Sequence, residues 1–245
     1  MNSQQTLPSP VSATKNPITS ALKKALESGQ IRRKNSTEYR SFIKHHYDGI
    51  AGKLTRVSGI LTGHALLAGQ VFKPEAFDVR GCKRILDAGC GDGRYCREIL
   101  RRADPDASIA AFDLSQSMLR RASRRLKSDR ISYVSADLTR LPYPDQFFDA
   151  MVCGWVIEHL PDPRPALREF ARVLRPGGKL LLMTTEDTFA GALCSSLWHC
   201  RTYNRREIQG YVEECGLIWQ RPLYFSNLHR LFRIGGVIQE VRRPE

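Results

Sequence analysis

The most constraining feature of the sequence is a glycine-rich stretch from Arg84 to Arg94, which reads Arg-Ile-Leu-Asp-Ala-Gly-Cys-Gly-Asp-Gly-Arg. Ile85 and Leu86 are typical of a buried parallel strand, and residues 95–102 carry apolar side chains at helical spacing. The glycines therefore lie between a strand and a helix. Because glycine accepts positive φ and has no side chain, the backbone can turn sharply there and approach a bound molecule. Ligands bind at this carboxyl end of the strands in doubly wound sheets, so the stretch predicts a ligand-binding turn.

Two kinds of cofactor fit such a turn. The dinucleotide fingerprint is G-x-G-x-x-G, and Arg94 occupies its last position here. Residues 87–93 instead read Asp-x-Gly-x-Gly-x-Gly, which resembles the first motif of the class I S-adenosylmethionine-dependent methyltransferases. Asp113 ends the next apolar run, where a carboxylate can accept both ribose hydroxyls of either cofactor. This aspartate supports nucleoside binding without choosing between the two.

Later stretches favour the methyltransferase family. Residues 136–138, Ala-Asp-Leu, resemble its adenine-binding segment, and residues 148–155 resemble its fourth motif. Residues 174–180, Leu-Arg-Pro-Gly-Gly-Lys-Leu, resemble the turn before its fifth strand. The resemblance covers roughly Tyr39 to the C-terminus and is closest to the small-molecule branch, which includes the quinone-biosynthesis methyltransferases.

Strand and helix patterns alternate from Lys83 onward, which predicts a parallel sheet with right-handed crossovers. The resemblance implies an α/β, Rossmann-like fold with a seven-stranded, mostly parallel sheet, helices on both faces, an antiparallel last strand and an N-terminal helical cap. Strands are expected at 84–88, 108–113, 131–135, 148–153, 179–184, 217–224 and 236–241, the final two as antiparallel neighbours. Helices are expected at 93–102, 116–126, 163–174 and 205–215. Ser115 is expected to cap the second helix and Asp162 the third.

We expect three parts along the chain. Residues 1–36, rich in Ser, Thr, Gln and Pro at the start, form a disordered or loosely helical tail. Residues 37–80 form a helical cap, and residues 81–245 form the S-adenosylmethionine-binding methyltransferase domain, with an insertion around 186–204 that looks like a substrate lid. A chain of 245 residues suits one large α/β domain with a cap better than two independent domains.

The composition of the sequence limits which cellular compartment and which binding partners we expect. The seven cysteines are scattered, no apolar run is long enough to span a membrane, and no signal peptide is recognisable, so we expect a cytoplasmic protein. The net charge of +13 is compatible with contact to nucleic acid or an anionic membrane surface. The densest basic run, residues 120–127, alternates with apolar positions at helical spacing, which favours a solvated helix face over a binding patch.

The resemblance implies a set of cofactor-binding residues on the glycine turn, after each of the next three strands and in the cap. They are Asp87, Gly89, Gly91, Asp113, Leu114, Asp137, Leu138, Cys153, Gly154 and Tyr47. Asp87 either holds the amino-acid end of S-adenosylmethionine or caps the following helix. Asp137 and Leu138 border the adenine, or Asp137 only orders its own turn. Tyr47 is a cofactor contact or packs within the cap.

S-adenosylmethionine carries an already activated methyl group, so the protein mainly supplies binding, alignment and a dry site. His159 follows the fourth strand and titrates near neutral pH, which makes it the candidate general base, with Glu158 as a second candidate. His159 can equally brace its loop. Substrate contacts are expected at Trp155, Trp198 and Tyr203, although Trp155 also suits simple packing. No metal is expected, because the Cys and His residues of the insertion lack a second ligand pair.

These observations give three hypotheses for function. The first is an enzyme that transfers a methyl group to a small, apolar or aromatic acceptor by in-line displacement. The second is methylation of RNA or another polyanion, which the basic surface favours, although no RNA-binding module or Asn-Pro-Pro-Tyr motif is recognisable. The third is a non-catalytic, cofactor-binding partner protein, which the complete cofactor motifs disfavour. A dinucleotide oxidoreductase is a fourth reading that Arg94 disfavours.

Overall fold

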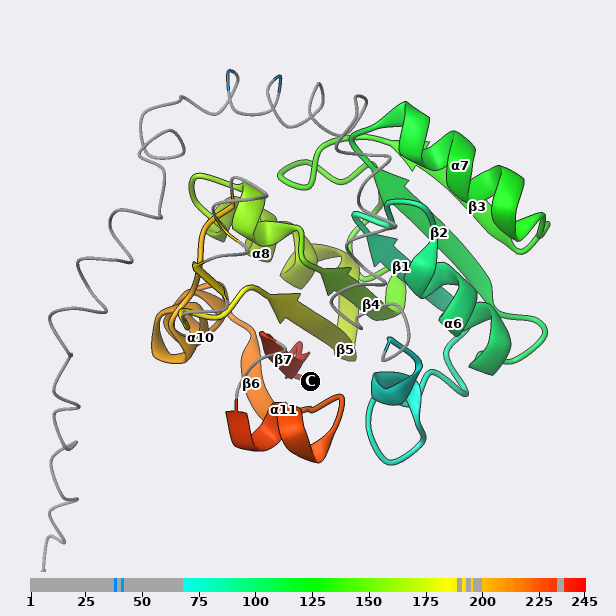
Figure 1. Ribbon diagram of the computed structural model, residues 1–245. Helices are drawn as coiled ribbons and strands as arrows, with labels where there is room; N and C mark the ends of the chain where they lie inside the picture. The colour runs from blue at the N-terminus through cyan, green and yellow to red at the C-terminus, as the bar shows by residue number, and fades with distance from the viewer. Residues whose placement is uncertain are drawn as a thin grey trace, which may run out of the picture.

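The structure is a computed structural model that describes residues 38, 41, 68–188, 191, 192, 195, 200–232 and 236–245. In this part of the chain, seven strands form one sheet in the order β3-β2-β1-β4-β5-β7-β6 (Figure 1). The strands are β1 (Arg84–Ala88), β2 (Ser108–Asp113), β3 (Ile131–Ser135), β4 (Phe148–Gly154), β5 (Leu174–Thr184), β6 (Ile218–Pro222) and β7 (Val237–Arg242). The predicted tail and most of the predicted cap lie outside the described residues.

The sheet is parallel from β3 to β5 and antiparallel only where β7 is paired. β1 pairs in parallel with β2 and with β4, while β7 runs antiparallel to both β5 and β6. This arrangement confirms the expected α/β fold with a mostly parallel sheet, an antiparallel last strand and antiparallel final neighbours. Since the chain moves outward from β1 to β3 and then returns to β4, the order of the strands reverses between β1 and β4. Ligands bind at such reversal points in open parallel sheets.

Helices cover both faces of the sheet, as expected (Figure 1). They are η1 (Ala68–Phe72), α6 (Arg94–Arg102), α7 (Gln116–Leu126), η2 (Ile157–His159), α8 (Arg164–Val173), α10 (Arg205–Glu214) and α11 (Asn227–Phe232), where η marks a 3-10 helix. Side chains alternate along a strand, so Ile85 packs in a core cluster with η1 and α6, while Leu86 packs in a second cluster with α8 and α10. Phe72 and Phe77, in the range assigned to the cap, lie in the first cluster and are buried.

Most element boundaries agree with the sequence patterns. β1, β2 and β3 begin and end at the predicted residues. The Ser115 side chain accepts a hydrogen bond from the Met118 amide at 3.2 Å, so its predicted role as a helix cap is confirmed. The N-cap of α8 is Pro163, one residue after the predicted Asp162, although Asp162 Oδ1 accepts a hydrogen bond from the Arg164 amide at 3.0 Å. The boundary between the third predicted helix and the fifth strand was wrong. Leu174 begins β5 because its backbone pairs with Phe148, and the register then shifts around the Arg-Pro-Gly-Gly segment.

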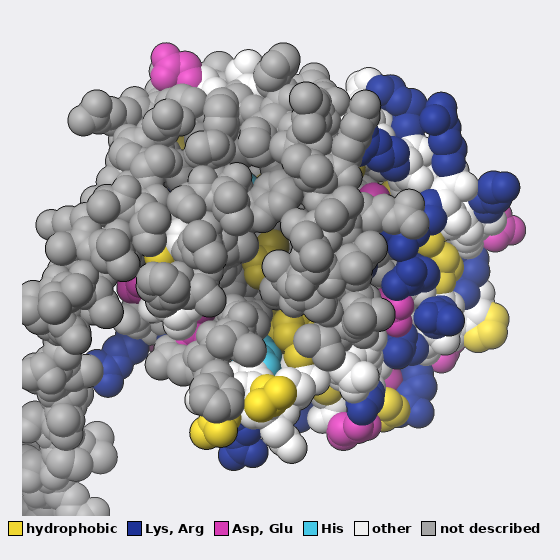
Figure 2. All heavy atoms as spheres, viewed as in Figure 1, with side chains coloured by type: hydrophobic (Ala, Val, Ile, Leu, Met, Phe, Trp, Pro, Cys, Tyr) yellow, Lys and Arg dark blue, Asp and Glu magenta, His cyan; other side chains and the backbone are white. Residues whose placement is uncertain are grey.

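The surface is dominated by basic residues on one side. Figure 2 shows Lys and Arg side chains gathered over α6 and α7, on the right of the view. Of the helices in the described part of the chain, none is both long enough and apolar enough to cross a membrane.

Candidate functional site

The predicted ligand-binding turn follows β1, at the edge where the strand order reverses. Gly89 has a φ of 78° and Gly91 a φ of 53°, both in the left-handed region that glycine tolerates. A Cβ atom on Gly89 would lie 2.3 Å from Cγ2 of Val156, so a side chain is excluded there. Among the described residues, a Cβ atom on Gly91 would have no neighbour within 4 Å. At Gly89 the turn therefore packs against the segment that follows β4, whereas at Gly91 the described residues leave space beside it.

Asp87 lies at the end of β1 and is fully buried. Its Oδ2 atom accepts hydrogen bonds from the Cys96 amide at 2.9 Å and from the Cys96 thiol at 3.0 Å, so the carboxylate does cap α6. The other oxygen, Oδ1, is buried and has no hydrogen-bond partner among the described residues. Burial raises the pKa of Asp87 to about 7. One carboxylate oxygen thus orders the turn while the other remains for a donor on a ligand.

Asp113 is held beside the glycine turn. Its Oδ2 atom accepts a hydrogen bond from the Gly91 amide at 2.9 Å, and its Oδ1 atom accepts one from the Ser115 amide at 2.8 Å. Two fixed backbone donors therefore orient the carboxylate at the carboxyl end of β2. Leu114, the next predicted cofactor residue, connects Asp113 to the capping serine.

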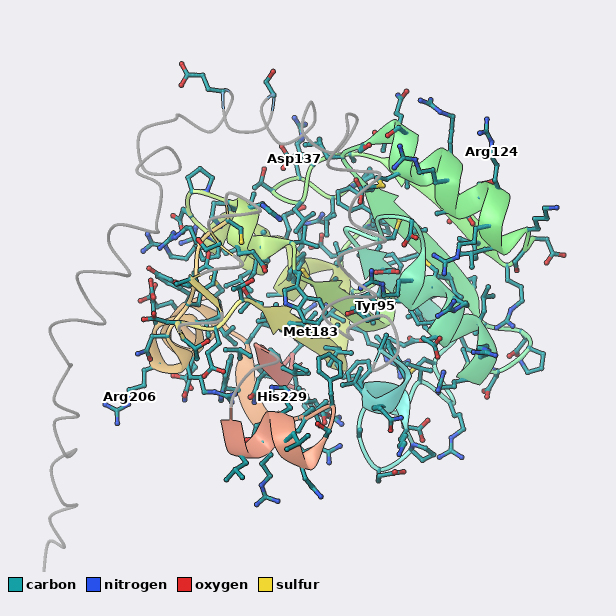
Figure 3. All side chains as sticks on the ribbon, in the orientation of Figure 1. Tyr95, Arg124, Asp137, Met183, Arg206 and His229 are labelled. Atoms are coloured by element: carbon teal, nitrogen blue, oxygen red, sulfur yellow. The ribbon has the colours of Figure 1, made fainter. Side chains whose placement is uncertain are left out.

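Asp137 and Leu138 follow β3. Asp137 Oδ1 accepts hydrogen bonds from the amide and the hydroxyl of Thr139, both at 2.8 Å, so this carboxylate orders its own turn. Leu138 is buried in the core cluster that contains Phe112. Figure 3 shows Asp137 at the upper edge of the molecule, well separated from Tyr95 at its centre. The adenine contacts of this pair stay a prediction.

The end of β4 contains the predicted residues Cys153, Gly154 and Trp155. Cys153 is fully buried on the α8 side of the sheet. A Cβ atom on Gly154 would lie 2.5 Å from Cε2 of Tyr95, so this glycine allows the tyrosine ring to lie over the strand end. Trp155 has a φ of 55°, which is rare for a bulky residue, and its amide donates to the Met183 carbonyl at 2.9 Å. Such backbone outliers cluster at functional sites.

Trp155 is the middle of an aromatic row made by Phe72, Tyr95, Trp155 and Phe225. The Trp155 ring lies 6.3 Å from Tyr95 and 6.0 Å from Phe225 between ring centroids, with interplanar angles of 19° and 15°. The Phe72 and Tyr95 centroids are 6.0 Å apart. Figure 3 shows Tyr95 close to Met183 at the centre of the molecule, beside the ends of β4 and β5. The row is a mostly buried aromatic cluster next to the glycine turn, in which Trp155 is the partly exposed member.

Glu158 lies in η2, directly after the end of β4, and is 1% exposed. Its carboxylate accepts hydrogen bonds from the Thr184 hydroxyl at 3.1 Å, the Thr185 hydroxyl at 2.8 Å and the Thr185 amide at 3.2 Å. Burial raises the pKa of Glu158 to about 7. These contacts brace η2 against the end of β5. His159, the neighbouring candidate base, is also buried, and its catalytic role stays a prediction.

Tyr203, predicted to contact the substrate, is fully buried. Its hydroxyl donates to the Ile157 carbonyl at 3.3 Å, and its amide donates to the Thr185 carbonyl at 2.9 Å. The structure therefore uses this tyrosine to fasten the insertion after β5 to η2. The predicted residues Tyr47 and Trp198 lie outside the described residues, as does part of the predicted lid.

Four residues at this edge were missed by the sequence analysis. Phe72, Tyr95 and Phe225 belong to the aromatic row, and His229 of α11 holds the backbone of Phe225. His229 Nδ1 accepts a hydrogen bond from the Phe225 amide at 3.1 Å, and Nε2 lies 2.9 Å from the Gly236 carbonyl oxygen. This pattern requires a neutral imidazole that donates from Nε2, and burial lowers the pKa of His229 accordingly. The only sequence signal was the position of Tyr95, two residues after the glycine motif.

A model of the family described as "Methyltransferase domain" matches residues 86–182, which span β1 to most of β5. The chain carries a class I S-adenosylmethionine-dependent methyltransferase domain. The match includes the glycine turn, Asp113 and the end of β4, so the sequence motifs and the edge described above coincide. The methyltransferase resemblance inferred from the motifs is thereby confirmed.

Curated relatives are similar over the methyltransferase domain. The ubiquinone/menaquinone biosynthesis C-methyltransferase UbiE of Pasteurella multocida is 27% identical over 151 residues, which cover 60% of this chain and 56% of that protein. The methyltransferase GfsG of Streptomyces halstedii is 38% identical over 115 residues, which cover 44% of this chain and 40% of that protein. This chain thus spans only about half the length of the curated relatives that it matches.

A solved structure shares the methyltransferase fold. It is a putative methyltransferase from a complex with the Haloferax volcanii Trm112 methyltransferase activator, with a TM-score of 0.67 and 16% sequence identity. The likeness covers 85% of this chain and 98% of that chain. At this identity the comparison supports the fold alone.

The family and the fold imply S-adenosylmethionine as the cofactor of the methyltransferase domain, and the residues at the edge fit it. A buried carboxylate oxygen of Asp87 has no partner among the described residues, which suits the ammonium group of the ligand's amino-acid end. No described residue fills the space beside Gly91, and the Asp113 carboxylate is oriented next to it. S-adenosylmethionine carries no phosphate, so its binding site does not need the cluster of charges that a pyrophosphate would require.

Proposed function

We propose that this protein transfers a methyl group from S-adenosylmethionine to a small, apolar or aromatic acceptor by in-line displacement. The observation that carries the proposal is the aromatic row, in which the partly exposed Trp155 directly follows the end of β4 beside the glycine turn. Flat aromatic rings suit flat apolar acceptors. The similarity to the Pasteurella multocida protein, which is named as a C-methyltransferase of ubiquinone and menaquinone biosynthesis, supports an acceptor of this class.

Bound S-adenosylmethionine supplies an activated methyl group. In the proposal, Asp87 holds the amino-acid end, Asp113 accepts the ribose hydroxyls, and Asp137 with Leu138 borders the adenine. The protein's main contribution is alignment of the acceptor within a site that excludes water, and alignment of this kind supplies about 7–11 kcal/mol of a barrier. The face of Trp155 suits the positive charge of a sulfonium.

His159 is the general base in this proposal, for acceptors that must lose a proton. It follows the end of β4 in η2, and Glu158 beside it is tied to Thr184 and Thr185. Because Glu158 already accepts three hydrogen bonds, we assign it to holding η2 in place and leave the proton transfer to His159. The predicted catalytic role of Glu158 thereby becomes a positioning role.

Peripheral contact with an anionic membrane surface is a further part of the proposal. Leu228 and Leu231 of α11 are 62% and 74% exposed, and the exposed Arg230 lies between them in the sequence. The same helix contributes His229, which supports the aromatic row. An exposed apolar pair with a cation suits the headgroup region of an anionic bilayer, from which an apolar acceptor would be drawn.

The first experiment is a calorimetric titration of the purified protein with S-adenosylmethionine, S-adenosylhomocysteine and NADH. We expect binding of the two sulfur nucleosides and none of NADH. A methyl-transfer screen then compares phenols, quinones, amines and RNA, with apolar acceptors offered in solution and in anionic vesicles. Methylation of phenols or quinones supports the proposal. Methylation of RNA alone would mean that the acceptor is a polyanion and not a small apolar molecule.

The His159→Ala variant serves as the second arm of this experiment. If His159 is the base, the variant binds S-adenosylhomocysteine as the wild type does and turns over at least tenfold more slowly. Turnover at the wild-type rate across the pH range would remove His159 from the mechanism. Failure of the wild-type protein to bind either sulfur nucleoside would contradict the cofactor assignment itself.

A further inference from the structure

The hydroxyl of Tyr95 is an unexplained polar atom in the interior of the protein. Tyr95 is 4% exposed, and its hydroxyl oxygen is buried with no hydrogen-bond partner in the described part of the structure. Leaving a buried polar group without a partner costs free energy, so native proteins rarely do so without a reason. A ligand that supplies the missing partner is one such reason.

The position of this hydroxyl places it at the cofactor edge. Tyr95 is the second residue of α6, directly after the glycine turn. A Cβ atom on Gly154 would lie 3.2 Å from Cζ of Tyr95, the carbon that carries the hydroxyl. Gly154 ends β4, and β4 pairs with β1 up to the register pair Ala88 and Cys153, next to Gly89. The hydroxyl therefore lies between the glycine turn and the end of β4.

A second unpartnered atom lies at the same edge, and its polarity is complementary. Oδ1 of Asp87 is a buried acceptor, while the Tyr95 hydroxyl can donate. The two residues are tied together, because Asp87 Oδ2 accepts from the amide and thiol of Cys96, the residue after Tyr95. Burial, with the charges of Asp87 and Glu158, raises the pKa of Tyr95, so the hydroxyl keeps its proton. One acceptor and one donor match an amino-acid end, which carries an ammonium and a carboxylate.

We propose that the Tyr95 hydroxyl donates a hydrogen bond to the carboxylate of the amino-acid end of S-adenosylmethionine, while Asp87 Oδ1 accepts one from the ammonium. The proposal rests on the cofactor assignment above and adds a binding residue to it. Both residues already sit at the edge before a ligand binds, so the ligand completes two hydrogen bonds that the protein alone cannot make.

The test compares two ligands that differ in their amino-acid end. S-adenosylhomocysteine carries that end, and 5′-methylthioadenosine lacks it while keeping the adenine, the ribose and the sulfur. The Tyr95→Phe variant removes only the hydroxyl and keeps the ring of the aromatic row. We expect it to bind S-adenosylhomocysteine about tenfold or more weakly and 5′-methylthioadenosine with unchanged affinity, since hydrogen bonds to charged groups are the strong ones.

Tyr143→Phe is the matched control. The Tyr143 hydroxyl is also buried without a partner, but its ring packs on Phe147 and Phe148, at the start of β4 and thus at the opposite end of that strand from Gly154. This control should leave both affinities unchanged. Neither variant should lower the melting temperature of the free protein, because each removes an unpartnered buried polar atom. The rise in melting temperature on adding S-adenosylhomocysteine should be smaller for Tyr95→Phe alone.

Three results would overturn the proposal. Unchanged affinity of Tyr95→Phe for S-adenosylhomocysteine would show that the hydroxyl does not bind it, and a raised KM for the acceptor alone would assign it to the acceptor instead. If Tyr95→Phe lost the same factor of affinity for S-adenosylhomocysteine and for 5′-methylthioadenosine, the hydroxyl would position the aromatic ring and would not bind the amino-acid end. If the wild-type protein binds neither ligand, the cofactor assignment itself fails, which is distinct from the first two outcomes.

Discussion

Two halves of the site are built in different ways. The half that we propose binds the cofactor, from β1 to β3, orients its carboxylates with backbone amides: Asp113 bonds amides two and 22 residues away, and Asp87 one nine residues away. The acceptor half, from the end of β4 to β7, depends on distant side chains, since Glu158 bonds Thr185 and Tyr203 bonds Ile157 across 27 and 46 residues. A local, backbone-based site leaves a motif in the sequence, whereas a site assembled from distant side chains does not.

The two halves meet at Gly89. The space that a side chain would occupy there is filled by Val156, which directly follows Trp155 of the aromatic row. The turn that approaches the cofactor is therefore packed against the segment that leads into η2. Changes at this contact should affect both halves, while changes elsewhere should affect one.

Gly89→Ala is expected to have the largest effect. The added methyl group would overlap Val156, and the left-handed backbone would be strained, so the free energy of unfolding should fall by about 2–5 kcal/mol and S-adenosylhomocysteine binding should be lost. Denaturant titration and calorimetry measure the two quantities. Adding Val156→Ala should recover part of the loss, as a double-mutant cycle would show.

Gly91→Ala is the control for this prediction. Gly91 shares the left-handed backbone but faces open space, so its substitution should cost only about 1–2 kcal/mol of stability. If the two alanine variants lose equal stability, the Val156 contact does not join the two halves.

Asp113→Ala should disrupt the cofactor half and spare the acceptor half. The variant loses the carboxylate that Gly91 and Ser115 orient, and with it the proposed ribose hydrogen bonds. The affinity for S-adenosylhomocysteine should fall by about 100-fold, or ~2.7 kcal/mol, in calorimetry. The exposed Asp129 provides a control for loss of one negative charge. Equal affinities of Asp113→Ala and the wild type would rule out the assigned ribose contact.

Glu158→Gln should change the acceptor half in a pH-dependent way. Because the pKa of Glu158 is raised to about 7, its contribution to stability is present below pH 4.5 and is lost as the pH rises through 7. From pH 5 to pH 8, the wild type should lose about 2 kcal/mol of unfolding free energy relative to Glu158→Gln. Urea titrations at both pH values measure this difference.

The exposed Glu213 offers a control for the pH series, because Glu213→Gln removes a carboxylate from the surface of α10. The unfolding free energy of Glu213→Gln should match that of the wild type at both pH values. A constant difference in unfolding free energy between wild type and Glu158→Gln from pH 5 to pH 8 would contradict the raised pKa of Glu158.

The fold could be predicted because its signals are local. The spacing of apolar residues located β1, β2 and β3, and Ser115 marked the helix start at which it acts as a cap. The start of β5 was missed because the pairing of Leu174 with Phe148 overrides the helical spacing that precedes it. The short helix α11 was missed because it is held by His229, whose ring bonds Phe225 and Gly236.

By itself, the sequence determined the parallel sheet, the glycine turn, the cofactor class and the carboxylates Asp87 and Asp113 that flank the turn. These depend on residue type and short spacing, which fix backbone conformation directly. Only the tertiary structure decided that Tyr95, Trp155 and Phe225 form one aromatic row, and that one oxygen of Asp87 and the Tyr95 hydroxyl lack partners within the described part of the chain. Such features depend on which distant side chains share a volume, and this is settled only when the sheet and its helices pack together.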